Sequence, residues 1–396
     1  MKILLINNIF YRKGGSEAVF FNTAELLTKA GNEVRFFSIE NPHNCSTEQP
    51  AYFAPFLSGI KRALAYFYNP YAAKILDSVL DEWHPDIAHI HLIWGGLSPS
   101  IIKILHKHSV PVVHTAHDYR MVWPAYTFRN GKGQICEKCK NRYFHCILGK
   151  CSKGSLPQSI MMALEMRYRN LFLNPASLLD GIIYVSQFSK RIHESHNNRL
   201  ASVYNTVLYN FSKKLNGSEP DDFFLYSGRL SAEKGCRTMI KAFLNNPELK
   251  LVVAGFGPIE AELKELAKDS DNIIFRGHLN KDELFDLVEK CRFVVVPSEC
   301  YENNPMSIIE AYAASKPIIG ARIGGIPEIV EDGKTGFLFE SGNSYDLSRV
   351  LNKCEKLYDT QYSDMCRATD RMFSQWFNAE AYIARLLDFY NSVINV

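Results

Sequence analysis

Short apolar runs alternate with longer stretches of helical spacing along almost the whole chain. Runs rich in Val, Ile and Leu predict buried strands at 2–7, 33–39, 86–91, 111–115, 181–185 and 201–205, and then at 222–227, 249–254, 272–275, 292–297 and 317–321. Stretches of helical spacing separate most of these runs, for example at 16–30, 97–108, 236–246, 258–269, 281–290 and 306–315. Near-continuous apolar strands that alternate with helices are typical of parallel sheets covered on both faces.

The alternation predicts an α/β fold with two doubly wound, Rossmann-like domains and a cleft between them. A chain of 396 residues is long enough for two such cores. The polar, turn-rich segment 211–222 is the best linker. We therefore expect domains at 1–210 and 223–376, and a C-terminal helix within 377–396 that crosses back to the first domain. Ligands in such folds bind beyond the carboxyl ends of the strands, so residues at strand ends are the first functional candidates.

Composition narrows the class of protein. A hydrophobic content of 46% and a charged content of 22% are those of an ordinary globular protein. The net charge of +3 is too small to indicate nucleic-acid binding, and it agrees with mild attraction to an anionic ligand or membrane surface. The first apolar run is too short for a signal peptide, and no run of about eighteen apolar residues occurs. Ten cysteines without a signal peptide favour a reducing compartment, so we expect a cytoplasmic protein, with peripheral contact at the inner membrane face as a second expectation.

Two glutamates near the strand predicted at 292–297 carry the strongest functional signal. Glu302 follows the strand in a loop, and Glu310 falls in the second turn of a helix predicted to start at Pro305. Free N–H groups at a helix start favour anions, and carboxylates accept hydrogen bonds from sugar hydroxyls. The segment therefore predicts a site that holds a phosphorylated sugar.

Two cations follow the strand predicted at 222–227. Arg229 and Lys234 lie five positions apart in one loop. Arginine offers phosphate a planar fork and lysine a compact charge, so together they could neutralise a diphosphate as it leaves. The competing interpretation is a solvated basic loop, which the nearby pair of glutamates makes less attractive.

Glycines occupy several other strand ends. Gly14 and Gly15 follow the first strand and precede a helix that Ser16 could cap. Gly255 and Gly277 follow two strands of the second half, where backbone groups could grip a nucleotide base. Each glycine is equally compatible with a plain tight turn.

Histidines mark the strand ends of the first half. His117 and Asp118 follow the strand predicted at 111–115, where His117 could act as a polar or acid–base group near a reacting centre. The alternative is a hydrogen-bonded histidine that only fixes the strand end. His89 and His91 are expected to pack or cap their strand rather than to act.

A basic segment at 131–154 contains four cysteines, Cys136, Cys139, Cys146 and Cys151. The first pair has the spacing of a zinc knuckle, and the later intervals are short. The alternatives are a structural tetrathiolate zinc site, free thiols or a redox pair. Four protein ligands would leave a zinc ion no open position, so we expect no catalytic cofactor here.

Two segments combine helical spacing with large apolar residues. In the aromatic-rich range 52–82, Phe56, Ile60, Leu64 and Phe67 share one helical face, and Pro70 divides the range into two helices. Packing against the sheet is the favoured interpretation, and the alternative is a surface that meets a lipid-borne acceptor. The same two interpretations apply to Met161–Met166.

Several of these residues, in their order and spacing, resemble glycosyltransferase family 4, or group 1, enzymes with the two-domain GT-B architecture. The matching pieces are Gly14-Gly15-Ser16-Glu17, His117, Gly228-Arg229-Leu230, Glu233-Lys234-Gly235, Glu302, Glu310, Gly324-Gly325-Ile326-Pro327-Glu328-Ile329-Val330 and the segment 332–338. The resemblance covers nearly the whole chain.

The resemblance implies transfer of a hexose-type sugar from a nucleotide-diphosphate sugar, with retention at the anomeric carbon and no catalytic metal. Arg229 and Lys234 would hold the diphosphate, and Glu310 would bind the ribose. Glu302 would contact the donor sugar, helped by loop groups from Asn303 and Asn304 to Met306, and His117 would lie near the transferred sugar. Family members usually carry small or apolar residues and a glycine where Asn303, Asn304 and Pro305 stand, which affects the expected donor sugar more than the reaction.

The acceptor implied by analogy is a glycan or a lipid-linked intermediate of cell-envelope polysaccharide synthesis. Two other functions remain open at this point. One is a different GT-B reaction, such as that of a sugar-nucleotide epimerase, and the other is a non-catalytic partner that binds a nucleotide sugar. A zinc-containing nucleic-acid binder is disfavoured by the low net charge.

Overall fold

The computed structural model describes residues 1–140 and 142–395. Residue 141, within the cysteine segment, and residue 396, at the end of the expected C-terminal helix, lie outside the described residues. The chain forms two compact units. Unit 1 comprises residues 1–208 and 383–396, and unit 2 comprises residues 209–382.

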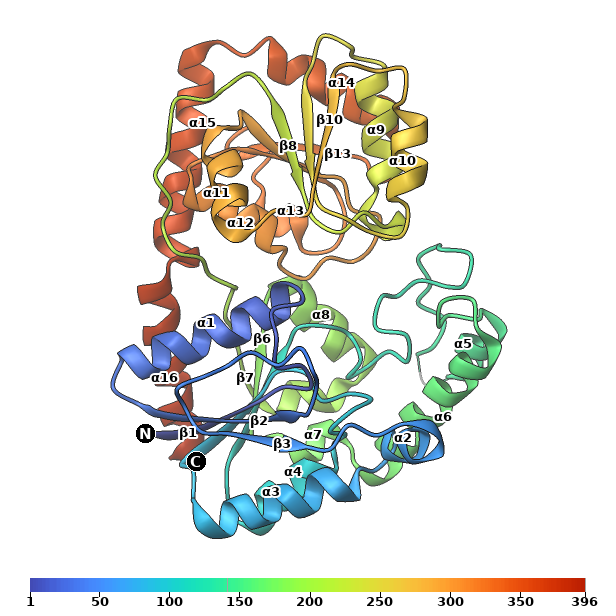
Figure 1. Ribbon diagram of the computed structural model, residues 1–396, viewed down its shortest axis with the longest axis vertical. Helices are drawn as coiled ribbons and strands as arrows, with labels where there is room; N and C mark the ends of the chain where they lie inside the picture. Colours follow the sequence, from blue (N-terminus) through green and yellow to red (C-terminus); the bar gives the residue numbers. More distant parts are fainter. Residues whose placement is uncertain (141, 396) are drawn as a thin grey trace. The chain divides into compact units, whose positions relative to one another are not determined.

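Unit 1 is built on a seven-stranded parallel sheet in the order β3-β2-β1-β4-β5-β6-β7. Its strands are β1 (Lys2–Ile6), β2 (Glu33–Ile39), β3 (Ala51–Ala54), β4 (Ile87–Ile90), β5 (Val112–Ala116), β6 (Gly181–Tyr184) and β7 (Tyr204–Val207). Its helices are α1 (Gly15–Lys29), α2 (Gly59–Ala65), α3 (Pro70–Glu82), α4 (Ser100–Lys107), α5 (Phe144–Leu148), α6 (Leu156–Phe172), α7 (Pro175–Leu178), α8 (Gln187–His196) and the 3₁₀ helix η1 (Asn198–Ser202). In Figure 1, α1 lies on one side of this sheet and α3 and α4 on the other.

Unit 2 is built on a six-stranded parallel sheet in the order β10-β9-β8-β11-β12-β13. Its strands are β8 (Phe224–Ser227), β9 (Leu251–Ala254), β10 (Ile273–Gly277), β11 (Phe293–Val296), β12 (Ile318–Ala321) and β13 (Gly336–Phe339). Its helices are η2 (Ala232–Lys234), α9 (Cys236–Leu244), α10 (Glu260–Leu266), α11 (Lys281–Lys290), α12 (Met306–Ala313), α13 (Ile326–Ile329), α14 (Ser344–Glu355), α15 (Asp359–Met372) and the π-helical turn η3 (Phe373–Phe377). The final helix, α16 (Ala379–Ile394), begins in unit 2 and continues in unit 1.

Both sheets are doubly wound, as the apolar strands predict. In unit 2 the chain proceeds from β8 outward to β10, and then returns to β11 and proceeds the other way to β13. The strand order therefore reverses between β8 and β11, and in unit 1 it reverses between β1 and β4. Open α/β sheets bind ligands outside the carboxyl ends of the strands at such a switch point.

Most expected strands are present, and the differences have local causes. The sequence did not indicate β3 or β13. The edge strand β3 is only partly buried and lies at the start of an aromatic stretch with helical spacing. The run predicted as a strand at 201–205 begins in η1, and β7 starts only at Tyr204, because Asn197 caps the 3₁₀ turn by accepting from Arg199 N.

The segment predicted as a linker, 211–222, belongs to unit 2 in the structure. Leu215 is buried in a unit 2 core and its N–H donates to Ala313 O at 3.0 Å. Ser212 N donates to Phe377 O at 3.0 Å. The segment is polar because most of its residues are exposed and only a few, such as Leu215, are buried. The change of unit falls between Leu208 and Tyr209.

Buried histidines line the carboxyl ends of β4 and β5 in unit 1. His89 contacts Tyr390 of α16 through Nδ1 at 2.6 Å and Thr115 Oγ1 through Nε2 at 2.7 Å. His91 Nδ1 lies 2.8 Å from His117 Nε2. The Tyr390 contact joins the C-terminal helix to the unit 1 sheet.

Because charged imidazole is costly to bury, the folded state keeps these histidines neutral. Burial lowers the pKa of His114 to about 3 and the pKa of His117 and of His193 to about 4.

No helix in the described part of the chain combines the length and the apolar character needed to cross a membrane.

The pH dependence of stability follows from the sign of these shifts. In the unfolded chain these histidines take up protons near pH 6.5, whereas in the folded chain they do so only near pH 4 or below. Stability is therefore complete above about pH 6.5 and falls as the pH drops from there toward 4. Urea unfolding should show a loss on the order of 2–3 kcal/mol for each of these buried histidines between pH 7 and pH 4.5.

A matched pair of variants tests the origin of this loss. His193→Gln removes one buried imidazole and should make the decline less steep, whereas His278→Gln, at an exposed position of unit 2, should leave it unchanged. A decline of equal steepness in both variants would contradict the assignment to buried histidines.

Candidate functional site

An ion pair joins the loops that follow β8 and β11 at the switch point of unit 2. Lys234 Nζ lies 2.6 Å from Glu302 Oε1. Ser298 Oγ donates to the same carboxylate oxygen at 2.6 Å. Glu302 thus receives hydrogen bonds from both loops, with a longer contact from Cys300 Sγ at 4.0 Å, and the sequence indicated the lysine and the glutamate but not Ser298.

The pair keeps both of its members charged. Burial alone would lower the pKa of Lys234, but the charge of Glu302 and its hydrogen bond outweigh burial and raise that pKa above its usual value. Burial alone would raise the pKa of Glu302, yet the charge of Lys234 and the bonds from Lys234 and Ser298 bring it below the usual range. A fixed ammonium and a fixed carboxylate therefore stand at the switch point.

Glycines let the loops of this site approach at backbone distance. Gly235 has φ +69°, and a Cβ there would lie 1.8 Å from Pro297 O. Gly324 has φ +62°, and a Cβ there would lie 2.5 Å from Glu302 N. Gly325 N donates to Glu302 O at 2.7 Å. Both the left-handed backbone and the lack of space require glycine at 235 and 324, which explains the glycines beside Lys234 and in the 324–330 motif.

Arg229 lies in the same loop as Lys234 but is exposed. Its carbonyl accepts from Tyr226 OH at 2.8 Å, which holds the loop backbone. Among the described residues, no hydrogen bond or ion pair engages its guanidinium. The group can therefore turn to an anionic ligand without first breaking an internal contact.

Glu310 lies in the second turn of α12, as predicted, and the helix itself begins at Met306 with Pro305 as its N-cap. Among the residues that the structure describes, no side chain caps this helix start. Burial raises the pKa of Glu310 to about 7, against the lowering effect of the Lys281 charge. Near neutral pH this carboxyl is therefore partly protonated.

The loop between Glu302 and α12 is held from the start of unit 2. Asn304 is buried, its Oδ1 accepts from Asn210 N at 2.8 Å, and its carbonyl accepts from Asn210 Nδ2 at 2.9 Å. Asn304 thus has a structural role that the sequence did not indicate. Asn303 and Met306 are half-buried on either side of it.

The other glycine positions predicted in unit 2 are neighbours. Gly255 follows β9 and Gly277 ends β10, and Gly255 N donates to Gly277 O at 2.7 Å. Both lie at the carboxyl edge of the sheet that also carries Arg229, Lys234 and Glu302. These five of the predicted unit 2 positions therefore share one edge of the sheet.

In unit 1, Gly14 and Gly15 form an exposed turn at the start of α1. The expected cap by Ser16 is wrong, because Gly14 is the N-cap and Ser16 Oγ instead donates to Glu17 Oε1 at 3.1 Å. Gly14 has extended backbone, and a Cβ there would meet only Glu17 Oε2 at 3.5 Å. Neither strain nor a clash within the fold requires a glycine at this position.

His117 is half-buried at the end of β5 and stacks on His91, with ring centroids 5.0 Å apart. Burial lowers its pKa to about 4, so near pH 7 it is a neutral polar group rather than a cation. His89 and His91 fix the strand ends, as the sequence predicts.

Two asparagines missed by the sequence interpretation organise the switch point of unit 1. Asn7 Oδ1 accepts from Leu92 N at 3.0 Å, and Asn8 Oδ1 accepts from Leu97 N at 2.8 Å. They tie the loop after β1 to the loop after β4. The signal available in the sequence was their position directly after the first strand.

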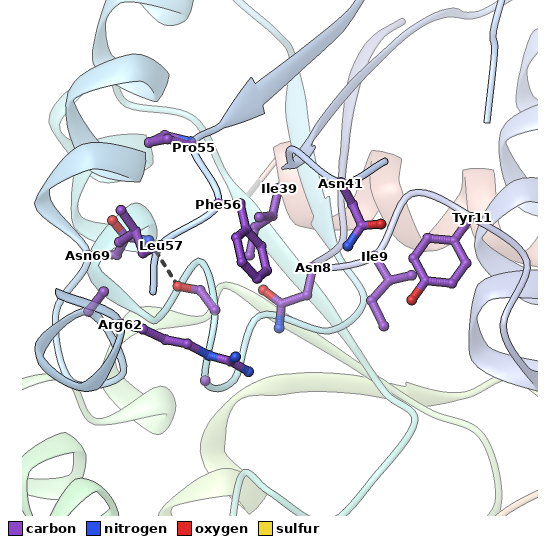
Figure 2. A pocket seen from close by; sticks show the side chains of 13 residues that line it. Asn8, Ile9, Tyr11, Ile39, Asn41, Pro55, Phe56, Leu57, Arg62 and Asn69 are labelled. Atoms are coloured by element: carbon purple, nitrogen blue, oxygen red, sulfur yellow. Dashed lines mark hydrogen bonds between the residues drawn. The ribbon is translucent and has the colours of Figure 1, made fainter. Parts of the chain in front are cut away.

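Asn8 also lines a pocket at this edge of the sheet, between the ends of β1 and β2 and helix α2 (Figure 2). Tyr11, Asn41 and Arg62 contribute polar groups to its wall, and Phe56 contributes an aromatic ring. The wall thus combines one cation, several hydrogen-bonding groups and apolar surface, which suits a polar ligand with an apolar or anionic portion.

The zinc site predicted at the four cysteines of segment 131–154 stays a prediction. No three His, Cys, Asp or Glu side chains among the described residues are grouped so that they could hold a metal ion. Cys139, Cys146 and Cys151 are buried as thiols. A hydrogen bond to Cys151, together with burial, raises the pKa of the Cys146 thiol, which favours its protonated form.

Two family models match the chain. Residues 13–208 match glycosyltransferase family 4, and residues 210–370 match the glycosyl transferases group 1. The chain is 26% identical to an uncharacterized 42.6 kDa protein in the cps region of Klebsiella pneumoniae, over 83% of this chain and 87% of the relative. It is 28% identical to the lipopolysaccharide 1,2-N-acetylglucosaminetransferase of Salmonella typhimurium, over 50% of this chain and 62% of the relative.

Solved structures show the same architecture. HepE from Anabaena, in complex with UDP and glucose, is 18% identical and superposes with a TM-score of 0.70 over 99% of this chain and 100% of that one. Its likeness shows the fold, which is the GT-B fold of two Rossmann-like domains. With both halves matched by their family models, the chain belongs to the group 1 glycosyltransferases.

Proposed function

We propose that this glycosyltransferase moves a hexose from a nucleotide-diphosphate sugar to a glycan or lipid-linked acceptor in cell-envelope polysaccharide synthesis. The proposal includes retention at the anomeric carbon and no catalytic metal. The observation that carries it is the Lys234–Glu302 ion pair at the unit 2 switch point, with exposed Arg229 in the same loop as Lys234. The names of the Salmonella relative and of the HepE complex support an envelope glycan and a UDP-sugar respectively.

Charge on the leaving group explains why two cations are needed. The diphosphate gains negative charge as its bond to the sugar breaks. Lys234 offers an ammonium already held in place by Glu302, and it keeps further N–H donors for phosphate oxygens. Arg229 adds a planar fork that can reach a second phosphate. In this proposal the two side chains supply the positive charge that a metal supplies in other transferases.

Glu302 suits the sugar and Glu310 suits the ribose. Glu302 stays ionised because of Lys234, so its carboxylate can accept hydrogen bonds from sugar hydroxyls. Glu310 is largely desolvated and has no comparable ion pair among the described residues, so ribose hydroxyls would give its charged form hydrogen bonds. The uncapped start of α12, between these two residues, adds backbone N–H groups.

Unit 1 would supply the acceptor side. The pocket lined by Asn8, Asn41 and Arg62 has hydrogen-bonding groups for a glycan and a cation for an acceptor phosphate (Figure 2). His117, neutral near pH 7, would accept or donate a hydrogen bond near the transferred sugar. The Gly14-Gly15 turn would leave room for the donor.

The cation assignment predicts a large loss of activity in two variants. Arg229→Met and Lys234→Met should each lower turnover of a UDP-hexose at least about tenfold, because each removes charge stabilisation of the departing diphosphate. Arg229→Met should leave thermal stability unchanged, since its side chain is exposed. Lys234→Met should also lower stability, because it leaves Glu302 charged and unpaired.

The matched control is Lys250→Met, an exposed lysine at the opposite, amino end of the unit 2 sheet, next to β9. It should retain full turnover. Wild-type rates in both Arg229→Met and Lys234→Met would refute the donor site. Detection of a sugar-nucleotide epimer without transfer would refute the reaction while leaving the site intact.

The pKa of Glu310 predicts how nucleotide affinity depends on pH. With a pKa of about 7, Glu310 ionises between pH 6 and pH 8, and its charged form binds ribose hydroxyls more tightly. The affinity for UDP, measured by calorimetry, should therefore rise several-fold over this range relative to Glu310→Gln. The comparison between the two proteins removes the titration of the nucleotide itself, and parallel pH profiles would rule out the ribose role.

A further inference from the structure

Helix α6 of unit 1 turns its apolar stripe outward. Leu156, Ile160, Leu164 and Leu171 follow one another at intervals of four, four and seven residues, which places them on one helix face, and all four are exposed. Leu171 is 65% exposed and the adjacent Phe172 is 61% exposed. In an ordinary surface helix this stripe would face the core.

The contacts made by the inward face of α6 explain why its apolar stripe faces solvent. It buries Glu165 and Arg169, whose carboxylate and guanidinium pair at 2.8 Å. Arg169 also donates to Met121 O at 3.1 Å and to Arg120 O at 2.8 Å, and it stacks over the Trp94 ring at 4.4 Å. This side of α6 also buries Ala163 and Met166, but its Glu165–Arg169 pair makes the polar contacts that hold the loop after His117, while the leucine stripe remains exposed.

Two neighbouring helices repeat the pattern. In α2, Ile60 and Leu64 are four residues apart and are 80% and 67% exposed. In α5, Phe144 and Leu148 are four residues apart, and Leu148 is 73% exposed. Each short helix thus presents an apolar pair to solvent.

The three helices belong to one region of unit 1 (Figure 1). Phe67, just after α2, contacts Tyr168 of α6 edge to face at 5.8 Å. Asn170 of α6 donates to the hydroxyl of Tyr143, which is the N-cap of α5. We call this surface the interfacial patch and define it by Ile60, Leu64, Leu148, Leu164, Leu171 and Phe172.

Positive charge is concentrated in the same segment of the chain. Residues 129–172 contain nine lysines and arginines and two glutamates, a net charge of +7, whereas the whole chain carries +3. Arg167 lies within the exposed α6 stripe, and Lys150 and Lys153 are exposed in the turn between α5 and α6. The rest of the protein is therefore net negative.

We propose that the interfacial patch docks unit 1 on an anionic lipid bilayer. Leucine, isoleucine and phenylalanine side chains would enter the boundary between headgroups and acyl chains, while the surrounding lysines and arginines would meet headgroup phosphates. Exposed apolar side chains next to lysines and arginines complement both the acyl chains and the anionic headgroups of a bilayer. The surface of a protein partner of ordinary composition would complement either the apolar side chains or the charges. This inference depends on unit 1 alone and not on the transfer reaction.

Docking would also bring a lipid-borne acceptor to the unit 1 pocket. Phe56, Arg62 and Ala65, in or just before α2, line that pocket (Figure 2). A headgroup at the bilayer surface would thus reach Arg62 and Asn8 while its tail stayed in the membrane. This second step does rest on the proposed function.

Vesicle flotation tests the docking directly. The full-length protein should float with vesicles of phosphatidylcholine and phosphatidylglycerol, and at least about tenfold less with phosphatidylcholine alone. A variant with Leu148→Ser, Leu164→Ser and Leu171→Ser should bind the anionic vesicles at least about tenfold more weakly, with an unchanged melting temperature because all three residues are exposed. Lys150→Glu combined with Lys153→Glu should weaken binding in the same direction.

The matched control is Tyr345→Ser, which removes an 80% exposed apolar side chain from unit 2 and should leave flotation unchanged. Three results would overturn the proposal. They are no flotation of the wild type with anionic vesicles, wild-type flotation of the triple serine variant, or a dimer in light scattering that the triple serine variant abolishes. The last result would make the patch a contact between two copies of the chain. Flotation needs no turnover, so it tests membrane docking even if the proposed transfer reaction is wrong.

Discussion

The functional half of the fold depends on holding a lysine and a glutamate from two different loops in contact. Lys234 comes from the loop after β8, and Glu302 comes from the loop after β11, and these strands are neighbours at the point where the strand order reverses. Gly235 and Gly324 allow the loops to approach at backbone distance. Each charge stabilises the other, so the site holds both charges before any ligand arrives.

Sequence patterns were sufficient for the two-domain α/β architecture and for the residues that carry charge, but not for β3, β13 or the boundary between the units. Apolar runs predicted both sheets because buried parallel strands need little else, and the position of Glu302 and Lys234 at strand ends predicted their common edge. Sequence patterns did not predict the side-chain partners that depend on tertiary contacts. Ser298 as a partner of Glu302 and Asn210 as the support of Asn304 depend on loop geometry that local spacing does not encode.

Helix α6 shows a second limit of pattern analysis. Helical spacing reveals that a helix has an apolar face, but not whether that face is turned inward. Here the inner face contains the ion pair of Glu165 and Arg169 beside Ala163 and Met166, and Arg169 donates to two carbonyls of the loop after His117. One helix thus holds the loop that follows His117 from one side and exposes leucines on the other.

The measurement that tests the donor site most directly is thermal unfolding of the protein in the presence of UDP, GDP or ADP. A ligand at about a hundred times its dissociation constant stabilises a protein by about 2.7 kcal/mol. One of the three nucleotides should raise the melting temperature of the wild type, and the rise should be lost in Arg229→Met, whose exposed side chain leaves the apo protein unchanged. No rise with any nucleotide, or an equal rise in Arg229→Met, would contradict a diphosphate site at the β8–β11 switch point.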